Sequence, residues 1–231
     1  MSVVRISSDW HLGPGSPPGH GRLAAAFLAR ARRDGARVVL NGDVFDDLFA
    51  GPGRAEAAHP DVMAELRALE AAALVARTAG NHDPDTGVAR VVLEVAGVGR
   101  VLVTHGNAVD PINSSPLGRL GDGISRRYGR TALVRGAAKV AEVAARAVAG
   151  RRMVEIFSRR CRAAVEREGF ALGVFGHVHA AHLVAGDRYA NAGWLSDQGL
   201  EYLELGPGGS RLATLRPSDL EAAEISGPVL R

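Results

Sequence analysis

Cysteine is almost absent from this sequence. Cys161 is the only cysteine among 231 residues, which excludes an internal disulfide and a metal site built from several cysteines. No run of 18 apolar residues occurs, and the N-terminal MSVVRISSDW lacks the charged and apolar regions of a signal peptide. We therefore expect a soluble, cytoplasmic protein in which any metal is bound by nitrogen and oxygen atoms.

Lysine is equally scarce, because Lys139 is a single residue among 28 Lys and Arg residues. The formal net charge is +3, but residues 111–168 hold 13 basic and 5 acidic residues, a surplus of 8 that leaves −5 for the remainder. Such a segment is either a solvated helix face or a surface for phosphate, nucleic acid or anionic lipid. Lys139 itself is a candidate phosphate contact or a product of neutral drift.

The chain is expected to form one domain over residues 1–231, because its length and 46% hydrophobic content allow a sizeable core. Leu23, Phe27 and Ala31 have helical spacing between two β-branched runs, which predicts a β-α-β unit. A second helix is expected over residues 55–72. Further strands are expected within residues 73–80, 89–97, 100–106, 170–177, 181–191, 199–205 and 210–217, and residues 218–231 are expected to be a frayed tail.

Polar clusters follow the apolar runs. Since the carboxyl ends of strands in an open α/β sheet meet in a common crevice, these clusters are expected to converge. Five of the eight histidines lie in them, which is hard to explain by packing. The clusters are Asp9-Trp10-His11, Gly42-Asp43-Val44-Phe45-Asp46, Gly80-Asn81-His82-Asp83, His105-Gly106 and Gly176-His177-Val178-His179.

The spacing within these clusters suits metal ions. Residues i and i+2 of an extended segment point the same way, so Asp9 and His11 can share one metal, and His177 and His179 share a face. Imidazole, carboxylate and carboxamide ligands favour Mn, Fe or Zn over Ca, Cu(I) or iron–sulfur clusters. The candidate ligands are too many for one ion, whereas two ions bridged by a carboxylate accommodate them all, as in two-metal displacement at phosphorus.

The ordered blocks D-x-H, G-D-x-x-D, G-N-H-D, H-G and G-H-x-H, from residue 9 to about residue 205, resemble the calcineurin-like metallophosphoesterases. The resemblance implies an α/β (α+β) fold, a four-layer αββα sandwich of two mixed β-sheets flanked by helices. It also implies two divalent metal ions, most often Mn²⁺, with Fe or Zn as alternatives. The first would be held by Asp9, His11, Asp43 and His179, and the second by Asp43, Asn81, His105 and His177.

Two bound cations lower the pKa of a water between them, so that a bridging hydroxide can attack phosphorus. The leaving oxygen still needs a proton or a compensating charge. His82 is the candidate for this role, and Asp46 resembles the family's orienting carboxylate. Asp83 is expected to stabilise its turn. His20, His59 and His182 are expected at the surface or behind the ligands.

Residues 111–168 are predicted to be a basic helical insertion. One apolar stripe runs from Val140 to Val148, and a second contains Val154, Phe157, Cys161 and Ala164. The helical pair is either a cap over the substrate or a dimerisation element, so the protein is expected to be a monomer or a homodimer. We favour the cap, because its charge complements phosphate and its apolar stripes suit acyl chains.

The blocks SDWHLG, GDVFDDLF and YANAGW, with the basic insertion, most resemble the UDP-2,3-diacylglucosamine pyrophosphatase group of lipid A synthesis. That resemblance implies an acylated nucleotide sugar as substrate, at the inner face of the cytoplasmic membrane. The chain departs from the best-known members at His82, where they carry Arg, and at Asn107. Candidate substrate contacts are Asn107, Arg126, Arg130 and Lys139.

Two other functions fit the same blocks. A phosphodiesterase, phosphatase or nuclease of the superfamily would act on another phosphoester, but a nuclease needs aromatic stacking platforms, and the basic segment contains only Tyr128 and Phe157. A non-enzymatic scaffold on this fold would be expected to have lost ligands.

Overall fold

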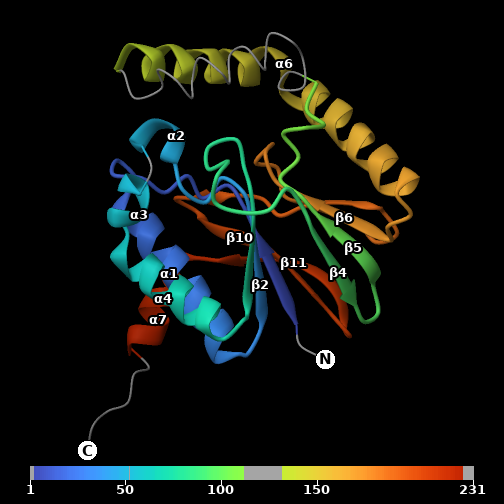
Figure 1. The fold of residues 1–231 in the computed structure, drawn as a ribbon, viewed down its shortest axis with the longest axis horizontal. Coiled ribbons are helices and arrows are strands. Elements are labelled where there is room, and N and C mark those ends of the chain that lie inside the picture. The colour runs from blue at the N-terminus through green and yellow to red at the C-terminus, as the bar shows by residue number, and fades with distance from the viewer. Residues whose placement is uncertain (1–2, 52, 112–131, 226–231) are drawn as a thin grey trace, which may run out of the picture.

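The computed structural model describes residues 3–51, 53–111 and 132–225, with the backbone alone for residues 132–149 and 222–225. Two mixed β-sheets form its centre (Figure 1). The first has the strand order β11-β10-β1-β2-β3, with β9 paired to β10. Its strands are β1 (Val4–Ser7), β2 (Arg37–Asn41), β3 (Val75–Thr78), β9 (Leu195–Ser196), β10 (Gly199–Gly206) and β11 (Gly209–Leu215).

The second sheet has the order β4-β5-β6-β8-β7. Strands β5, β6 and β8 run parallel, while β4 and β7 join antiparallel at the edges. In the first sheet β1, β2 and β3 are the parallel strands. The strands of the second sheet are β4 (Val91–Val95), β5 (Gly99–Val103), β6 (Leu172–Phe175), β7 (His182–Leu183) and β8 (Tyr189–Asn191).

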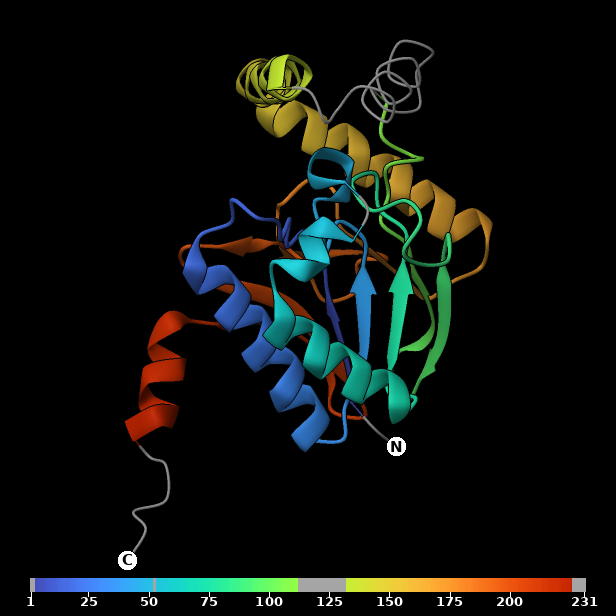
Figure 2. The ribbon, with the colours of Figure 1, turned by 60° about the vertical axis from the view of Figure 1, so that its left-hand side comes forward.

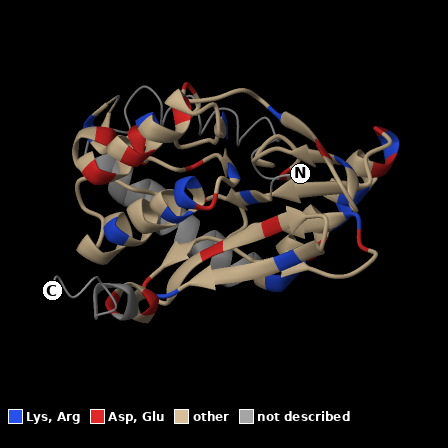
Figure 3. Ribbon diagram, turned by 90° about the horizontal axis from the view of Figure 1, so that it is seen from below, with Lys and Arg blue, Asp and Glu red and all other residues tan. Residues whose placement is uncertain are grey.

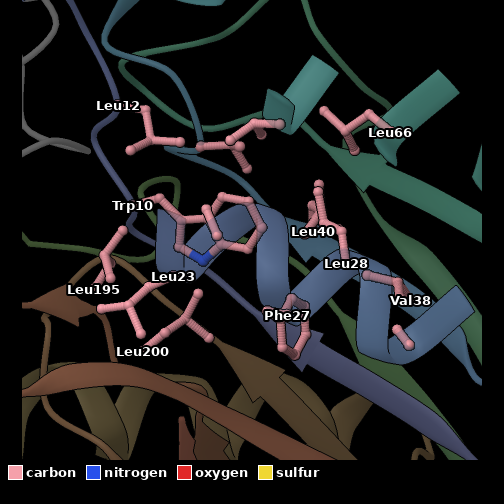
Figure 4. Packing of buried hydrophobic residues seen from close by; sticks show 14 of the residues in the cluster. Trp10, Leu12, Leu23, Phe27, Leu28, Val38, Leu40, Leu66, Leu195 and Leu200 are labelled. Carbon is pink, nitrogen blue, oxygen red and sulfur yellow. The ribbon is translucent and has the colours of Figure 1, made fainter. Parts of the chain in front are cut away.

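Three apolar clusters define four layers. Between the two sheets, alternate residues such as Ile6, Val39 and Val174 form one core. On the outer face of the first sheet, Trp10 packs among leucines beside Phe27 of α1 (Pro18–Arg33) (Figure 4), and α4 (Pro60–Ala71) covers the same cluster. A third cluster joins the second sheet to α6 (Ala132–Arg167). The predicted four-layer αββα sandwich is therefore confirmed.

Helix α6 is two helices joined at Gly150, whose φ of 20° and ψ of −121° are not helical. This agrees with the predicted helical pair. The first half crosses the end of the molecule where α2 (Asp47–Ala50) lies, and the second half descends along the second sheet (Figures 1 and 2). Arg126 and Arg130 lie outside the described residues, as do the side chains of Lys139 and of the stripe from Val140 to Val148.

The helix predicted over residues 55–72 is divided into α3 (Arg54–Ala57) and α4. Pro60 disfavours a helical conformation at the preceding residue, and His59 has φ −130° and ψ 65°. The run 181–191 similarly forms two short strands, β7 and β8, rather than one.

The prediction of a frayed C-terminal tail is wrong for residues up to 225, which form α7 (Pro217–Ile225). Leu220 packs against the cluster beneath α1, and the Arg216 amide donates a hydrogen bond of 2.8 Å to the Asp219 carboxylate at the helix start. Tertiary packing therefore stabilises a helix that has no apolar periodicity of its own.

Among the described helices, none combines the length and the apolar character required to cross a bilayer. Seen from the end opposite α6, basic and acidic residues are interspersed over strands and helices (Figure 3).

Candidate metal centre

The candidate ligands come from the carboxyl ends of strands in both sheets. Asp9, Asp43 and Asn81 follow β1, β2 and β3 of the first sheet, and His105 and His177 follow β5 and β6 of the second. The parallel directions of these strands bring the residues to one end of the sandwich. All seven predicted ligands take part in one connected cluster: Asp9, His11, Asp43, Asn81, His105, His177 and His179.

One group of ligand atoms surrounds Asp9, which is fully buried. Its Oδ1 lies 3.2 Å from His179 Nε2, and His179 Nε2 lies 3.1 Å from His11 Nε2. Ligand atoms of these three residues all lie within 4.8 Å of one another. Oδ2 of Asp43 is 3.9 Å from His11 Nε2, so Asp43 borders this group.

The second group is centred on Asn81. Its Oδ1 lies 3.2 Å from His105 Nε2 and 3.1 Å from His177 Nδ1. Asp43 Oδ2 is 3.2 Å from the same His105 nitrogen. Asp43 therefore stands between the two groups, in the position that a bridging carboxylate requires.

These distances fit metal coordination. Ligand atoms about 2.1 Å from a shared ion lie about 3.0–3.4 Å apart at octahedral or tetrahedral angles. The closest pairs in both groups are separated by 3.1–3.2 Å. A cation in the first group would also be a shared partner for the facing ring nitrogens of His11 and His179.

The backbone at the ligands is strained. Six non-glycine residues among those described have positive φ, and five of them are candidate ligands: Asp9, His11, Asp43, His177 and His179. Such conformations cost about 1–3 kcal/mol each and persist where the surrounding structure enforces them. Glycines let the chains approach, because a Cβ on Gly80 or Gly176 would collide with the carboxylate of Asp43 or Asp9.

The two buried carboxylates of the cluster, Asp9 and Asp43, make a positive charge beside them favourable. Although burial alone would raise the pKa of Asp9, neighbouring His105 and His179 lower it to about 2. His105 is fully buried, yet the charges of Asp43 and Asp9 raise its pKa to about 10. Burial, assisted by His82, lowers the pKa of His11 to about 4, which keeps its imidazole in the neutral form that binds metal.

His82 is held by Asp46, as predicted, through a hydrogen bond of 2.7 Å from Nδ1 to Oδ1. Its ring meets the His11 ring edge-on, with centroids 4.6 Å apart. His82 also belongs to a group with His11 and Asp43 whose ligand atoms lie within 4.8 Å. The geometry thus offers two roles for His82, a proton carrier beside the metals or a further ligand oriented by Asp46.

Asp83 stabilises the turn, and this prediction is confirmed. Its carboxylate accepts hydrogen bonds from the amides of Asp43, Val44 and Gly80 at 2.8–3.0 Å. The clamp fixes the loop after β2 against the loop after β3, and so holds Asp43 beside Asn81.

Asp110 is a residue that the sequence reasoning missed. Its Oδ2 lies 2.7 Å from His177 Nε2, which directs the other ring nitrogen toward Asn81. In the same way, His105 Nδ1 donates to the Asn41 carbonyl at 2.9 Å and leaves Nε2 for the cluster. Partners of this kind fix the tautomer of metal-binding histidines. The available signal was an acidic residue five positions after His105.

The other three histidines lie outside the cluster, as predicted. His20 contacts Asp197, His59 contacts the Gly13 carbonyl, and His182 contacts Asp187. Asn107 is partly exposed in the turn after His105.

No protein-family profile matches the chain, and neither does any curated protein sequence. Solved structures of similar topology include a conserved uncharacterised protein of Streptococcus pneumoniae described as a predicted phosphoesterase, with 16% identity, 93% and 98% of the two chains covered and a TM-score of 0.44. A dimetal phosphatase from Danio rerio has 11% identity, coverage of 92% and 98% and a TM-score of 0.47. A Vps29 single mutant from Entamoeba histolytica has 14% identity, coverage of 93% and 98% and a TM-score of 0.47.

Proposed function

We propose that this protein is a dinuclear metal-dependent phosphoester hydrolase of the calcineurin-like type. The observation that carries the proposal is the convergence of seven Asp, His and Asn ligands in two groups that share Asp43. Each group contains ligands from both sheets, so neither sheet alone could form it.

Asp9, His11, Asp43 and His179 would hold one divalent ion, and Asp43, Asn81, His105 and His177 the other. Nitrogen and oxygen ligands suit Mn, Fe or Zn, and the resemblance to the calcineurin-like metallophosphoesterases favours Mn²⁺ among them. When bound, such a pair acts as a Lewis acid toward the phosphoryl oxygens and supplies an activated water near neutral pH.

The chain's own residues position the reaction. Asp46 accepts a hydrogen bond from His82 Nδ1 and fixes the ring, so Nε2 is the atom that exchanges a proton with the leaving oxygen. Asp110 and the Asn41 carbonyl hold His177 and His105 in their binding tautomers. The hydrogen bonds of Asp83 keep the carboxylate of Asp43 between the two groups.

For the substrate, we propose a nucleotide-linked acylated sugar, cleaved at its pyrophosphate as by a UDP-2,3-diacylglucosamine pyrophosphatase. The blocks SDWHLG, GDVFDDLF and YANAGW and the basic segment support this. Helix α6 crosses the end of the molecule that carries the ligands (Figure 2), and Phe157 on its second half lies 6.0 Å from the His177 ring. The segment 111–168 would then be a cap, in a monomer or homodimer working at the cytoplasmic face of the membrane.

A general phosphodiesterase or phosphatase remains the second candidate, because His82 replaces the Arg of the best-known pyrophosphatases. A nuclease that tracks nucleic acid along the basic segment gains no support from the described part of that segment. Phe157, one of the two aromatic residues in the basic segment, is 1% exposed and packs against Phe175 and Tyr189, so it offers no platform to a nucleobase.

The decisive experiment is an assay with Mn²⁺ on four substrates: bis-p-nitrophenyl phosphate, a phosphomonoester, single-stranded DNA and UDP-2,3-diacylglucosamine. We expect turnover of the acylated nucleotide sugar, with release of UMP. Turnover of the simple diester alone would reject the specific substrate and retain the phosphoesterase. Absence of turnover with all four substrates, in Mn²⁺ and again in Fe²⁺ and Zn²⁺, would favour a scaffold.

A further inference from the structure

Trp194 is an exposed aromatic side chain in direct contact with the candidate metal centre. It is 38% exposed, and its indole stacks on the imidazole of His179, with ring centroids 5.3 Å apart and an interplanar angle of 15°. The other tryptophan, Trp10, is 1% exposed in the core. Since His179 covers part of the indole, the rest of the ring is what solvent or a ligand meets.

The backbone around Trp194 is fixed by hydrogen bonds to a candidate ligand, Asp9, and to two other buried residues. The Leu195 amide donates to the Asp9 carbonyl at 3.2 Å, and Ser8 Oγ donates to the Gly193 carbonyl at 3.2 Å. The Gly193 amide donates to Asn191 Oδ1 at 2.9 Å, with Gly193 at φ 77°. A ring held in this way loses little conformational entropy when a second ring stacks on it.

Trp194 ends a continuous row of aromatic rings along the site. Neighbouring centroids are 4.6–5.3 Å apart. The central three rings are histidines, whereas the two ends are apolar, so the row offers a polar centre flanked by stacking surfaces. In order, the rings are Phe49, His82, His11, His179 and Trp194.

We propose that Trp194 is a stacking subsite for a planar ring carried by the substrate, and hence that the substrate is a phosphoester with a nucleobase or an aryl group near phosphorus. The inference rests on the proposed function for the placement of phosphorus beside His179. Stacking on an aromatic side chain is typically worth about a tenfold gain in affinity or more. A substrate without a planar ring gains nothing from this surface.

Tryptophan fluorescence tests the subsite directly, since iodide quenches the exposed Trp194 and not the buried Trp10. Quenching is measured on the full chain loaded with Zn²⁺, with UMP against ribose 5-phosphate and phenyl phosphate against methyl phosphate. We expect at least one ring-bearing ligand to protect Trp194, while its ring-free counterpart does not. Protection by UMP alone identifies a nucleobase subsite, and protection by phenyl phosphate alone identifies an aryl subsite.

Two substitutions provide the matched controls. Both variants lack the quenched fluorophore, so ligand affinity is measured by isothermal titration calorimetry on the wild type and the variants alike. Trp194→Leu removes the ring and should weaken binding of the protecting ligand about tenfold, with the affinity for its ring-free counterpart unchanged; Trp194→Phe keeps a ring and should lie between. Metal content and Tm verify that each variant is folded and loaded. Equal weakening of both ligands, or no ring-dependent protection, overturns the subsite. Because these readouts need no turnover, ring-selective protection without hydrolysis would reject the proposed function and leave the subsite standing.

Discussion

At the scale of single residues, the three polar side chains of the tetrapeptide Gly80-Asn81-His82-Asp83 point in different directions and have different roles. Asn81 points to His105 and His177, His82 turns to Asp46, and Asp83 clamps the loop that carries Asp43. The side chains of three consecutive polar residues thus have three different sets of partners. Their identities could be proposed from sequence, whereas their directions depend on loop conformations that only the folded chain defines.

Substitutions at Asn81 and His82 should separate metal binding from catalysis. Asn81→Ala removes an oxygen from the second group and should leave about one metal ion per chain. His82→Ala should retain two ions and lower kcat about 10²–10⁴-fold. Metal content by mass spectrometry and kcat with bis-p-nitrophenyl phosphate are the measurements. Loss of an ion from the His82 variant would instead make His82 a ligand.

Asp47 should impose a pH dependence on stability. Burial, with the charges of Glu56 and Asp83, raises its pKa to about 6. Between its unfolded pKa near 4 and pH 6, the folded state binds more protons than the unfolded state, so this residue makes stability fall as pH rises through that window. Asp47→Asn removes the penalty and should stabilise the protein by about 0.5–1 kcal/mol at pH 7.5, a figure reduced for partial exposure.

At pH 4 the same substitution should have little effect, because the carboxyl is protonated in the folded state and half protonated in the unfolded state. Urea unfolding at both pH values measures the difference. Asp85→Asn, at an exposed position, is the control. An equal gain at pH 4 and pH 7.5 would show that the effect does not come from the charge.

At the scale of elements, the second half of α6 belongs to the core as well as to the site. Phe157 and Cys161 are buried against the second sheet. Arg162 forms a bidentate pair with Asp187 at 2.6 and 2.8 Å and lies over the Tyr189 ring, which ties the helix to β8. Whatever the first half of α6 covers, its second half is anchored.

Arg162→Lys should loosen that anchor. Lysine keeps the charge but loses the bidentate geometry and the stacked guanidinium. We expect a loss of about 1 kcal/mol, or a fall in Tm of about 2–4 °C by differential scanning calorimetry. Arg159→Lys, at an exposed position of the same helix, should change Tm by less than about 1 °C. Equal falls in Tm for the two variants would show that the pair of Arg162 and Asp187 makes no specific contribution to stability.

Elements with a strong local pattern were predictable from sequence, and those that depend on contacts were not. The helix carrying Leu23, Phe27 and Ala31 formed as expected, and so did the hairpin of β4 and β5. Helix α7 was missed because its stability comes from packing of Leu220. The candidate ligands were identifiable by type and spacing, but Asp110 and Trp194 were not assigned roles, because their importance comes from what they touch.

At the scale of the whole molecule, the cluster joins the two sheets. Asp9, Asp43 and Asn81 belong to the first, and His105, His177 and His179 to the second. A metal bound only by the native state stabilises by about 2.7 kcal/mol at a hundredfold excess over its Kd. Metal removal should therefore lower the free energy of unfolding, by weakening the contact between the two sheets, as well as abolish activity.

Treatment with EDTA should lower Tm by about 5–10 °C for each strongly bound ion, and added Mn²⁺ should restore it. The Asn81→Ala variant, with one complete group, should show about half of the wild-type shift. Differential scanning fluorimetry across a metal titration provides the measurement. A Tm indifferent to both chelator and metal would contradict metal binding at this cluster.

Because the candidate ligands are divided between the two sheets, they also leave the ribosome at different times during synthesis. Asn81 and His177 are separated by 96 residues, so at about 5–20 residues per second the ribosome delivers the second roughly 5–20 s after the first. A nascent chain that has folded only its opening β-α-β units holds Asp9, His11, Asp43 and Asn81, but it lacks the imidazoles of the second sheet that complete the two groups. If the cluster binds metal as proposed, neither group would be complete until the second sheet has docked, and the finished fold rather than the emerging peptide would decide which ion enters.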